Sequence, residues 1–213
     1  IDGLTSYVPS FIKNILAEIT MQARSTPEIN QHSGVSCRVT IRGFEALMGS
    51  ALRRCLILGE KRLVPRITDI DATFATMLGK IELEYGGQDK CAQDVVEDLV
   101  RRATKVVFDE HFSVEDLSSI IESFNNGIGA EVSQVIPSDE YMDGLNNVPG
   151  LYDAVKSLVN PDEPADAASA IEFILEGLHL SNRLNREAVN GTRTYHEQQP
   201  DVPDPAFKEI IKT

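Results

Sequence analysis

The side chains of this chain that are best placed for chemistry are arginines. Residues 33–38 (SGVSCR) form a run of mostly small residues that ends in Arg38, and a helical pattern follows. An arginine at a helix entrance can direct its planar fork of donors toward a phosphate held by a neighbouring domain. It can also pair with a surface carboxylate, and spacing alone favours that interpretation. Arg38 is therefore a candidate phosphate contact.

The motifs of nucleotide hydrolysis and of common hydrolases are absent. The sequence contains no GxxxxGK[ST] phosphate-binding loop, and no apolar strand ends in paired acids that would hold Mg²⁺. It also lacks GxSxG and HExxH. We therefore assign no catalytic residue and expect that this chain alone does not hydrolyse ATP.

Metal ligation is also not predicted. Asp109, Glu110 and His111 are adjacent, and three adjacent residues cannot share one helical face. His179 lies on a predicted helix, where a satisfied or surface histidine is the commoner case. Asp162, Glu163 and Asp166 form another acidic group, but they lack the glycine and the spacing of a calcium-binding loop. We interpret them as acidic residues that favour the amino terminus of a helix.

Composition narrows the class of protein further. Three widely spaced cysteines predict neither a disulfide framework nor a paired metal site, which is typical of a reduced, cytoplasmic protein. No apolar run is long enough to span a bilayer. The net charge is −13, and residues 71–213 carry all of the excess acid, so we expect neither a membrane nor a nucleic-acid partner.

Hydrophobic periodicity predicts three helices in the first eighty residues. They cover residues 9–24, 40–58 and 68–78, with a polar loop at 25–34. In the second helix we expect an inward stripe that includes a buried cysteine; it consists of Ile41, Phe44, Met48, Ala51, Cys55 and Leu58.

The remainder is also predicted to be mainly helical. An alternating strand is expected at 80–85, and the glycine pair after it marks a domain boundary. A weak strand signal at 131–136 suggests a partner for 80–85. Helices are expected at 89–109, 113–126, from Ser138, at 151–159 and from Pro164 to Leu184. The polar segment 191–213 is expected to be a mobile tail.

The first part resembles the helical lid of AAA+ ATPases of the magnesium chelatase subunit I and MoxR type. The resemblance is carried by residues 5–78: Ala23-Arg24 at a helix end, the turn at 33–38, the run ALRR at 51–54, Gly59, and Val64-Pro65 before Thr68. The runs SDEY (138–141) and FILEGLHLSNRL (173–184) resemble an acidic helical extension found in a related bacterial subgroup.

The resemblance implies an all-α fold with a lid at 1–79, an acidic helical bundle at 80–190 and the tail at 191–213, and it allows one small two-stranded β element. It makes Arg38 the second-sensor arginine, which touches the terminal phosphate of the nucleotide. Arg24, Arg53 and Arg54 become accessory basic residues. ATP and Mg²⁺ would serve the parent protein, whose upstream core, neighbouring subunits and protein client are the implied partners. The chain itself would be a fragment with no bound cofactor.

One alternative from another class stays open. A free-standing acidic helical interaction module with no nucleotide role would account equally well for the acidic surface and the missing phosphate loop. The coding sequence upstream of Ile1 distinguishes the two, because only the AAA+ reading requires a phosphate-binding loop there.

Overall fold

Helix α1 (Ser10–Ser25) lies where the apolar spacing predicts a helix. In the computed structural model, which describes residues 3–29, 37–78 and 91–198, its apolar face is completely buried. Pro9 precedes the helix with extended backbone angles (φ −56°, ψ 149°) and lacks an N–H that would need a partner. The buried face packs mainly on α4 (Ala92–His111).

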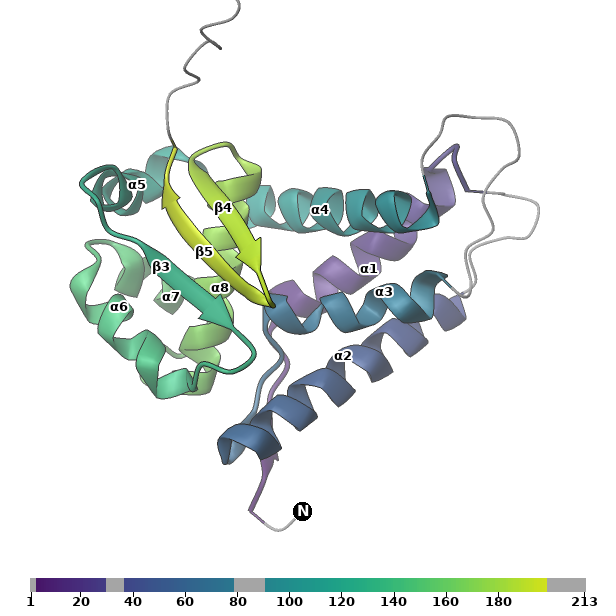
Figure 1. Ribbon diagram of the computed structural model, residues 1–213, viewed down its shortest axis with the longest axis horizontal. Coiled ribbons are helices and arrows are strands. Elements are labelled where there is room, and N and C mark those ends of the chain that lie inside the picture. Colours follow the sequence, from purple (N-terminus) through teal and green to yellow (C-terminus); the bar gives the residue numbers. More distant parts are fainter. Residues whose placement is uncertain (1–2, 30–36, 79–90, 199–213) are drawn as a thin grey trace, which may run out of the picture.

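An elongated arm of helices forms one half of the molecule (Figure 1). It contains α1, α2 (Cys37–Leu58), α3 (Asp71–Leu78) and α4, with the 3-10 turn η1 (Ile67–Asp69) ahead of α3. Strands β1 (Thr5–Ser6) and β2 (Arg62–Leu63) pair in parallel beside it. The long helix α2 packs chiefly on α3.

The other half is a smaller helical lobe that carries a sheet (Figure 1). Its helical elements are η2 (Glu115–Leu117), α5 (Ser118–Asn125), η3 (Ser138–Glu140), α6 (Tyr141–Asn147), α7 (Leu151–Leu158) and α8 (Pro164–Leu180). Strands β3 (Ala130–Ser133), β4 (Leu184–Val189) and β5 (Thr192–Glu197) form an antiparallel sheet in the order β3-β5-β4.

Helix α8 is the central element of the fold. Every residue from Ala165 to Leu178 is buried, as expected for a helix that is covered on all sides. Gly177 allows the closest approach, because a Cβ there would lie 1.9 Å from Cδ2 of Phe108 on α4. Close packing of α8 against α4 therefore requires glycine at this position.

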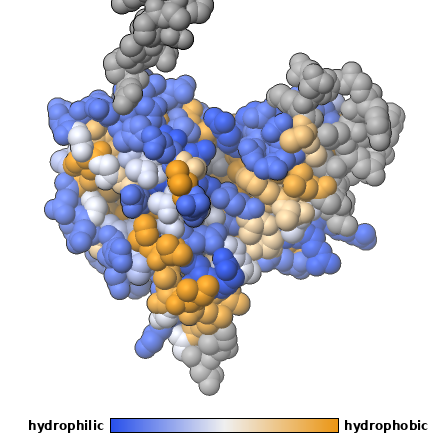
Figure 2. All heavy atoms as spheres, viewed as in Figure 1, coloured by the Kyte–Doolittle hydropathy of each residue, from blue (hydrophilic) through white to orange (hydrophobic). Residues whose placement is uncertain are grey.

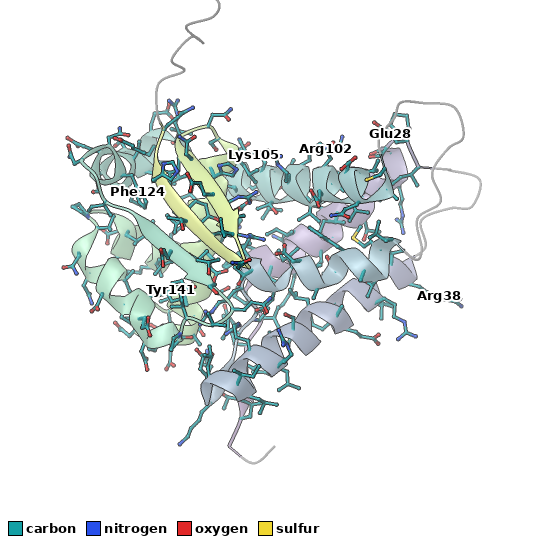
Figure 3. The ribbon with its side chains drawn as sticks, in the orientation of Figure 1. Glu28, Arg38, Arg102, Lys105, Phe124 and Tyr141 are labelled. Carbon is teal, nitrogen blue, oxygen red and sulfur yellow. The ribbon has the colours of Figure 1, made fainter. Side chains whose placement is uncertain are left out.

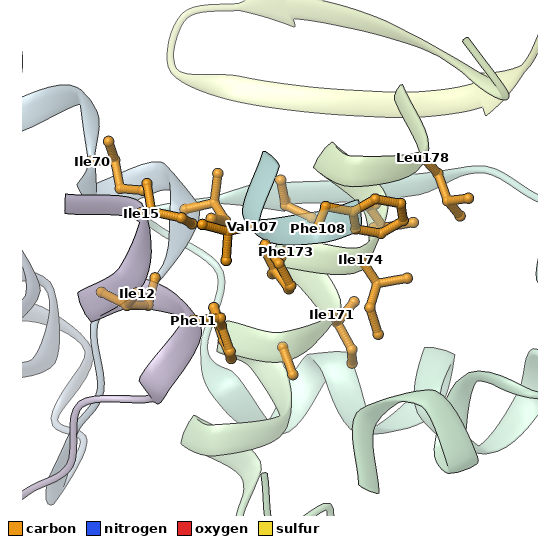
Figure 4. Close-up of a cluster of buried hydrophobic side chains, with 14 of the residues drawn as sticks. Phe11, Ile12, Ile15, Ile70, Val107, Phe108, Ile171, Phe173, Ile174 and Leu178 are labelled. Carbon is orange, nitrogen blue, oxygen red and sulfur yellow. The ribbon is translucent and has the colours of Figure 1, made fainter. Parts of the chain in front are cut away.

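One hydrophobic cluster joins the two halves (Figure 4). Phe11 on α1 stacks on Phe173 of α8 with ring centroids 4.5 Å apart, and Phe108 meets Phe173 edge-on at 5.9 Å. The same cluster contains residues from both sides of the boundary predicted between 79 and 80. Side chains from residues 1–79 and from residues 80–190 thus share one core.

The inward stripe predicted for α2 is partly wrong. Ala51 and Cys55 are buried, but Ile41 is 56% exposed and Phe44 is 38% exposed. The buried face instead includes Val39 and Leu47. The actual face also contains a glycine and an arginine, Gly43 and Arg54, which an apolar count does not score. Because the prediction counted only apolar residues, it placed the buried face on a different side of the helix.

The sheet departs from the expectation of one small two-stranded element. The strand predicted at 131–136 exists as β3, but its partner is β5. The strand predicted at 80–85 lies outside the described residues. The mainly helical fold class is confirmed, with a parallel strand pair and a three-stranded antiparallel sheet added to it.

The end of the chain also differs from its prediction. Helix α8 ends at Leu180, and Leu184 begins β4 rather than ending the helix. Residues 192–197, predicted to belong to a mobile tail, form the middle strand of the sheet. Asn190 (φ 51°) and Gly191 (φ 81°) make the two-residue turn between β4 and β5.

Candidate functional site

Arg38 lies in the first turn of α2, as the sequence predicts for a residue at a helix entrance. Its side chain is exposed, and it sits at the end of the helical arm that is far from Phe124 and Tyr141 in the other lobe (Figure 3). Arg24 is exposed in the last turn of α1. Both arginines therefore belong to the arm, and the turn at 33–36 lies outside the described residues.

The two adjacent arginines of α2 have different environments. Arg53 is exposed, and its Nη2 donates to Oε1 of Gln134 at 3.4 Å. Arg54 is 2% exposed and donates to both Asp69 Oδ2 (2.9 Å) and the Val64 carbonyl (2.7 Å). Because these bonds hold its guanidinium inside the protein, Arg54 stabilises the fold at its present position rather than facing a ligand.

Arg54 belongs to a buried polar cluster in which Arg66 is the central residue. Arg66 is fully buried and donates to Ser138 Oγ at 2.7 Å, to the Ile136 carbonyl at 2.9 Å and to Glu60 at 3.2 Å. Its guanidinium also lies 4.8 Å from the centroid of the Tyr141 ring. This arginine thereby links the segment before α3 to η3 and α6 of the other lobe.

Glu172 of α8 completes this first cluster. Its Oε2 accepts from the Thr68 backbone N–H at 2.9 Å, and its Oε1 accepts from the Tyr141 hydroxyl at 2.8 Å. Burial raises the pKa of Glu172 despite the nearby charge of Arg66, which lies 3.9 Å away. Both oxygens of Glu172 therefore accept hydrogen bonds, while burial opposes ionisation of the carboxyl group.

A second buried cluster surrounds Glu176, one turn further along α8. Its carboxylate accepts from the Tyr195 hydroxyl at 2.6 Å and from Arg186 Nη1 at 2.5 Å, and Arg193 lies 3.7 Å away. Arg193 also donates to both oxygens of Asp71 at 2.7 and 2.8 Å. Burial alone would raise the pKa of Glu176, but Arg193, Arg186 and the Tyr195 hydroxyl outweigh it and lower that pKa.

A cavity of about 360 Å³ opens beside this second cluster, between α3, α4 and the β4–β5 hairpin. Its lining combines Phe74 and Val100 with Glu176, Arg186 and Arg193. Because the two arginines already pair with Glu176 and Asp71, the lining does not select one class of charged ligand.

The predicted metal candidates do not assemble. Asp109 pairs with Lys105, and the His111 ring packs edge-on against Phe173. Asp166 is bound in a bidentate pair by Arg62, with distances of 2.7 and 2.9 Å. Within residues 3–29, 37–78 and 91–198, no three histidine, cysteine or carboxylate side chains gather in a group that could hold a metal ion.

His179 has a structural environment. Its Nδ1 lies 3.1 Å from the Leu184 carbonyl, and burial lowers the pKa of its imidazole. Among the described helices, none is both long enough and apolar enough to cross a membrane.

Apart from Arg54, sequence reasoning missed the charged residues of both buried clusters. Arg66, Glu172 and Glu176 are charged, and charged residues are rarely buried unless they are paired. Glu172 bonds to Thr68, 104 residues earlier, whereas Glu176 bonds to Arg186 and Tyr195, which follow it by 10 and 19 residues. Asn190-Gly191 was a usable signal, because this dipeptide between alternating residues is typical of a tight hairpin.

Comparison of the chain with protein-family models, with curated proteins and with solved structures finds no match.

Proposed function

We propose that this chain is the C-terminal lid and partner-binding portion of an AAA+ ATPase of the magnesium chelatase-like or MoxR-like kind. The observation that carries the proposal is Arg38, whose exposed side chain lies in the first turn of a 22-residue helix at the end of the arm. From there its guanidinium can reach a phosphate bound by an adjacent domain. It would distinguish ATP from ADP through contact with the terminal phosphate.

The surface of α2 supports a role for the arm as a docking element. Ile41, Phe44 and Leu56 of α2 are 56%, 38% and 53% exposed. Figure 2 shows apolar surface over α3 and the lower part of α2. Exposed apolar surface of this kind commonly marks contacts with another domain or protein. The upstream ATP-binding core of the parent protein is the proposed occupant.

Residues 80–190 would then bind a protein client or partner subunit while ATP turnover moves the lid. ATP and Mg²⁺ would be held by the upstream core, and a ring of such subunits would remodel the client. The buried clusters support mechanical coupling, because Arg66 and Glu172 connect the arm to the lobe through hydrogen bonds that are shielded from water.

The test requires a longer protein that includes the upstream core. There, Arg38→Ala should lower the ATP turnover number by about 100-fold, the cost of removing one donor to a transition-state oxygen. Arg42→Ala is the matched control, since Arg42 is exposed one turn along the same helix and pairs only with Glu45 among the described residues. Unchanged turnover in Arg38→Ala would disprove the sensor role.

One observation favours a free-standing interaction module as a second candidate. The shared core and the buried clusters join the arm and the lobe into one body. This reading predicts no phosphate-binding loop in the coding sequence upstream of Ile1, and it predicts partner binding that does not respond to ATP.

A further inference from the structure

Strand β3 is an edge strand with one residue whose backbone faces away from the sheet. The two-residue turn at 190–191 makes Val189 and Thr192 a hydrogen-bonded pair of the hairpin, so Thr192 directs its backbone toward β4. Alternation then directs Arg193 toward Val132 of β3. The backbone N–H and C=O of Glu131 therefore point to the open edge.

The next backbone N–H on that side confirms this alternation. The N–H of Ser133 donates to the Tyr141 hydroxyl at 3.3 Å, which is possible only if it points away from β5. One end of the β3 edge is thus closed by α6, while at Glu131 the edge offers a donor and an acceptor that no residue of the described part of the chain pairs with.

An apolar cavity lies directly beside this edge. Its volume is about 270 Å³, and it opens between β3, α5, α6 and α8. Phe124 and Tyr141, labelled in Figure 3, lie on two of its sides. The remaining wall is formed mainly by aliphatic side chains, which include Val132, Ile136, Val148, Leu151, Ile171 and Leu175. A space of this size accommodates one large apolar side chain.

The charge around the cavity has one sign. Glu131 and Glu140 are its charged lining residues, both are exposed, and the lining contains no lysine or arginine. Asp139 and Asp143 are exposed on η3 and α6 beside it. A partner segment with positive charge on either side of its apolar anchor would complement this rim.

We propose that β3 and this cavity form a docking site for an extended, basic segment of a partner protein. The segment would pair with the backbone of Glu131 as a fourth strand, insert one aromatic or branched aliphatic side chain into the cavity, and place lysines or arginines beside Glu131 and Glu140. Main-chain bonds supply affinity in this mode and the pocket supplies selectivity. The inference rests on the assignment of partner binding to residues 80–190 and is independent of nucleotide sensing by Arg38.

A synthetic peptide tests the site on the present chain. The probe is a fluorescein-labelled nonapeptide that alternates lysine and valine around a central phenylalanine, and fluorescence anisotropy measures its dissociation constant. Replacing the phenylalanine by alanine should weaken binding by about 30-fold, the value of one buried aromatic side chain. N-methylation of the residues on both sides of the phenylalanine should weaken it by about tenfold, because the main-chain donors are lost.

Gly144 provides a variant that fills the cavity without disturbing the fold. It lies on α6, it lines the cavity, and a Cβ at this position would meet no atom within 4 Å. Gly144→Leu should therefore keep the phenylalanine of the probe out of the cavity and weaken binding of the probe by at least about 30-fold. Because leucine is a better helix former than glycine, the midpoint of thermal unfolding should stay unchanged or rise. Gly49→Leu is the matched control, since Gly49 is exposed on α2 with equally open space around its Cβ.

Charge reversal by Glu131→Lys should weaken binding of the probe by about tenfold. Raising the salt concentration should reduce the difference in affinity between this variant and the unsubstituted protein. Three results would overturn the proposal: no binding of the probe, equal binding by Gly144→Leu, or binding that survives both N-methylation and loss of the phenylalanine. Binding that appears only after deletion of residues 199–213 would instead assign the cavity to the C-terminal segment of the chain. Unchanged ATP turnover in Arg38→Ala with intact peptide binding would refute only the sensor role.

Discussion

Glu172 and Glu176 lie one turn apart on α8, and the pKa values of these two buried carboxyl groups are shifted in opposite directions. Their exposed fractions are 0% and 4%, and each accepts a hydrogen bond from a tyrosine hydroxyl. Yet the pKa of Glu172 is raised and that of Glu176 is lowered. Depth of burial and hydrogen bonding to tyrosine therefore do not decide the direction of the pKa shift.

The difference follows from the charges in each cluster. Around Glu172, the two arginines at 54 and 66 already pair with other carboxylates, those of Asp69 and Glu60. Around Glu176, Arg186 donates directly to the carboxylate and Arg193 lies within 3.7 Å. The carboxylate of a buried acid is favoured when a cationic group donates directly to it, as Arg186 does to Glu176. The pKa is therefore raised in the first cluster and lowered in the second.

The largest expected change in the free energy of unfolding comes from removing the negative charge of Glu176 in the second cluster. Glu176→Gln should lower the free energy of unfolding at pH 7 by about 3 kcal/mol, because two arginines lose their buried partner. The folded-state pKa of Glu176 is lowered. This carboxylate therefore stabilises the folded protein above its unfolded-state pKa, and the stabilisation is lost as pH falls through its folded-state pKa. The deficit of the variant should therefore shrink below about pH 4.5.

Urea unfolding at several pH values measures this deficit. Glu187→Gln on the exposed end of β4 is the control and should change the free energy of unfolding by less than about 0.5 kcal/mol. A deficit in Glu176→Gln that does not depend on pH would show that the carboxylate is not ionised in the folded protein.

An intermediate effect is expected from Tyr195→Phe, which removes the hydroxyl that donates to Glu176. Loss of a buried hydrogen bond to an ionised group should cost about 2 kcal/mol at pH 7. Tyr152→Phe is the matched control, because the Tyr152 hydroxyl is exposed and lies 3.5 Å from Asp162. Thermal unfolding of both variants gives the comparison, and equal shifts would place the Glu176 cluster outside the cooperative core.

The smallest effect is expected from Glu172→Gln. The amide keeps an acceptor for the Thr68 N–H but presents its NH₂ group to the Tyr141 hydroxyl, so the free energy of unfolding at pH 7 should fall by about 1 kcal/mol. The folded-state pKa of Glu172 is raised. The contribution of this carboxyl group to the free energy of unfolding is therefore fully present below its unfolded-state pKa, and it is lost as pH rises through its folded-state pKa. Relative to the unsubstituted protein, this variant should gain stability with rising pH.

The pH dependence of Glu172→Gln should thus be opposite in sign to that of Glu176→Gln. Parallel pH profiles for the two variants would contradict the contrast between the clusters. Such profiles would mean that the arginines at 54 and 66 compensate Glu172 as fully as the hairpin arginines compensate Glu176.

The helices of this fold could be predicted because each of them buries a periodic apolar face. Residues 9–24 were predicted as a helix and α1 spans Ser10–Ser25; the predicted start at Pro164 is the start of α8. The buried face of α2 was predicted poorly because its face includes Gly43 and the paired Arg54. Hydropathy cannot register a position that is buried because a carboxylate elsewhere compensates it.

The candidate sites were harder to predict than the fold. Arg38 could be singled out because the prediction used only local sequence, namely a run of small residues before a helical pattern. Each buried cluster also depends on a contact between segments more than a hundred residues apart, Thr68 with Glu172 in the first and Asp71 with Arg193 in the second. The β3 edge and its cavity were missed for the same reason, since they exist only once β5 has paired with β3.

The position of β5 in the middle of the sheet has a consequence for biosynthesis. A ribosome releases β3 some sixty residues before it releases β5, so a nascent chain carries β3 with no strand beside it during that interval. The helices can form earlier because the hydrogen bonds within each helix join residues four apart in sequence. Translation arrest before Thr192 would leave Val132 and the edge of β3 uncovered, and would deprive Glu176 of both Arg193 and Tyr195. The hairpin of residues 184–197 thus completes the sheet after all of the described helices have been synthesised.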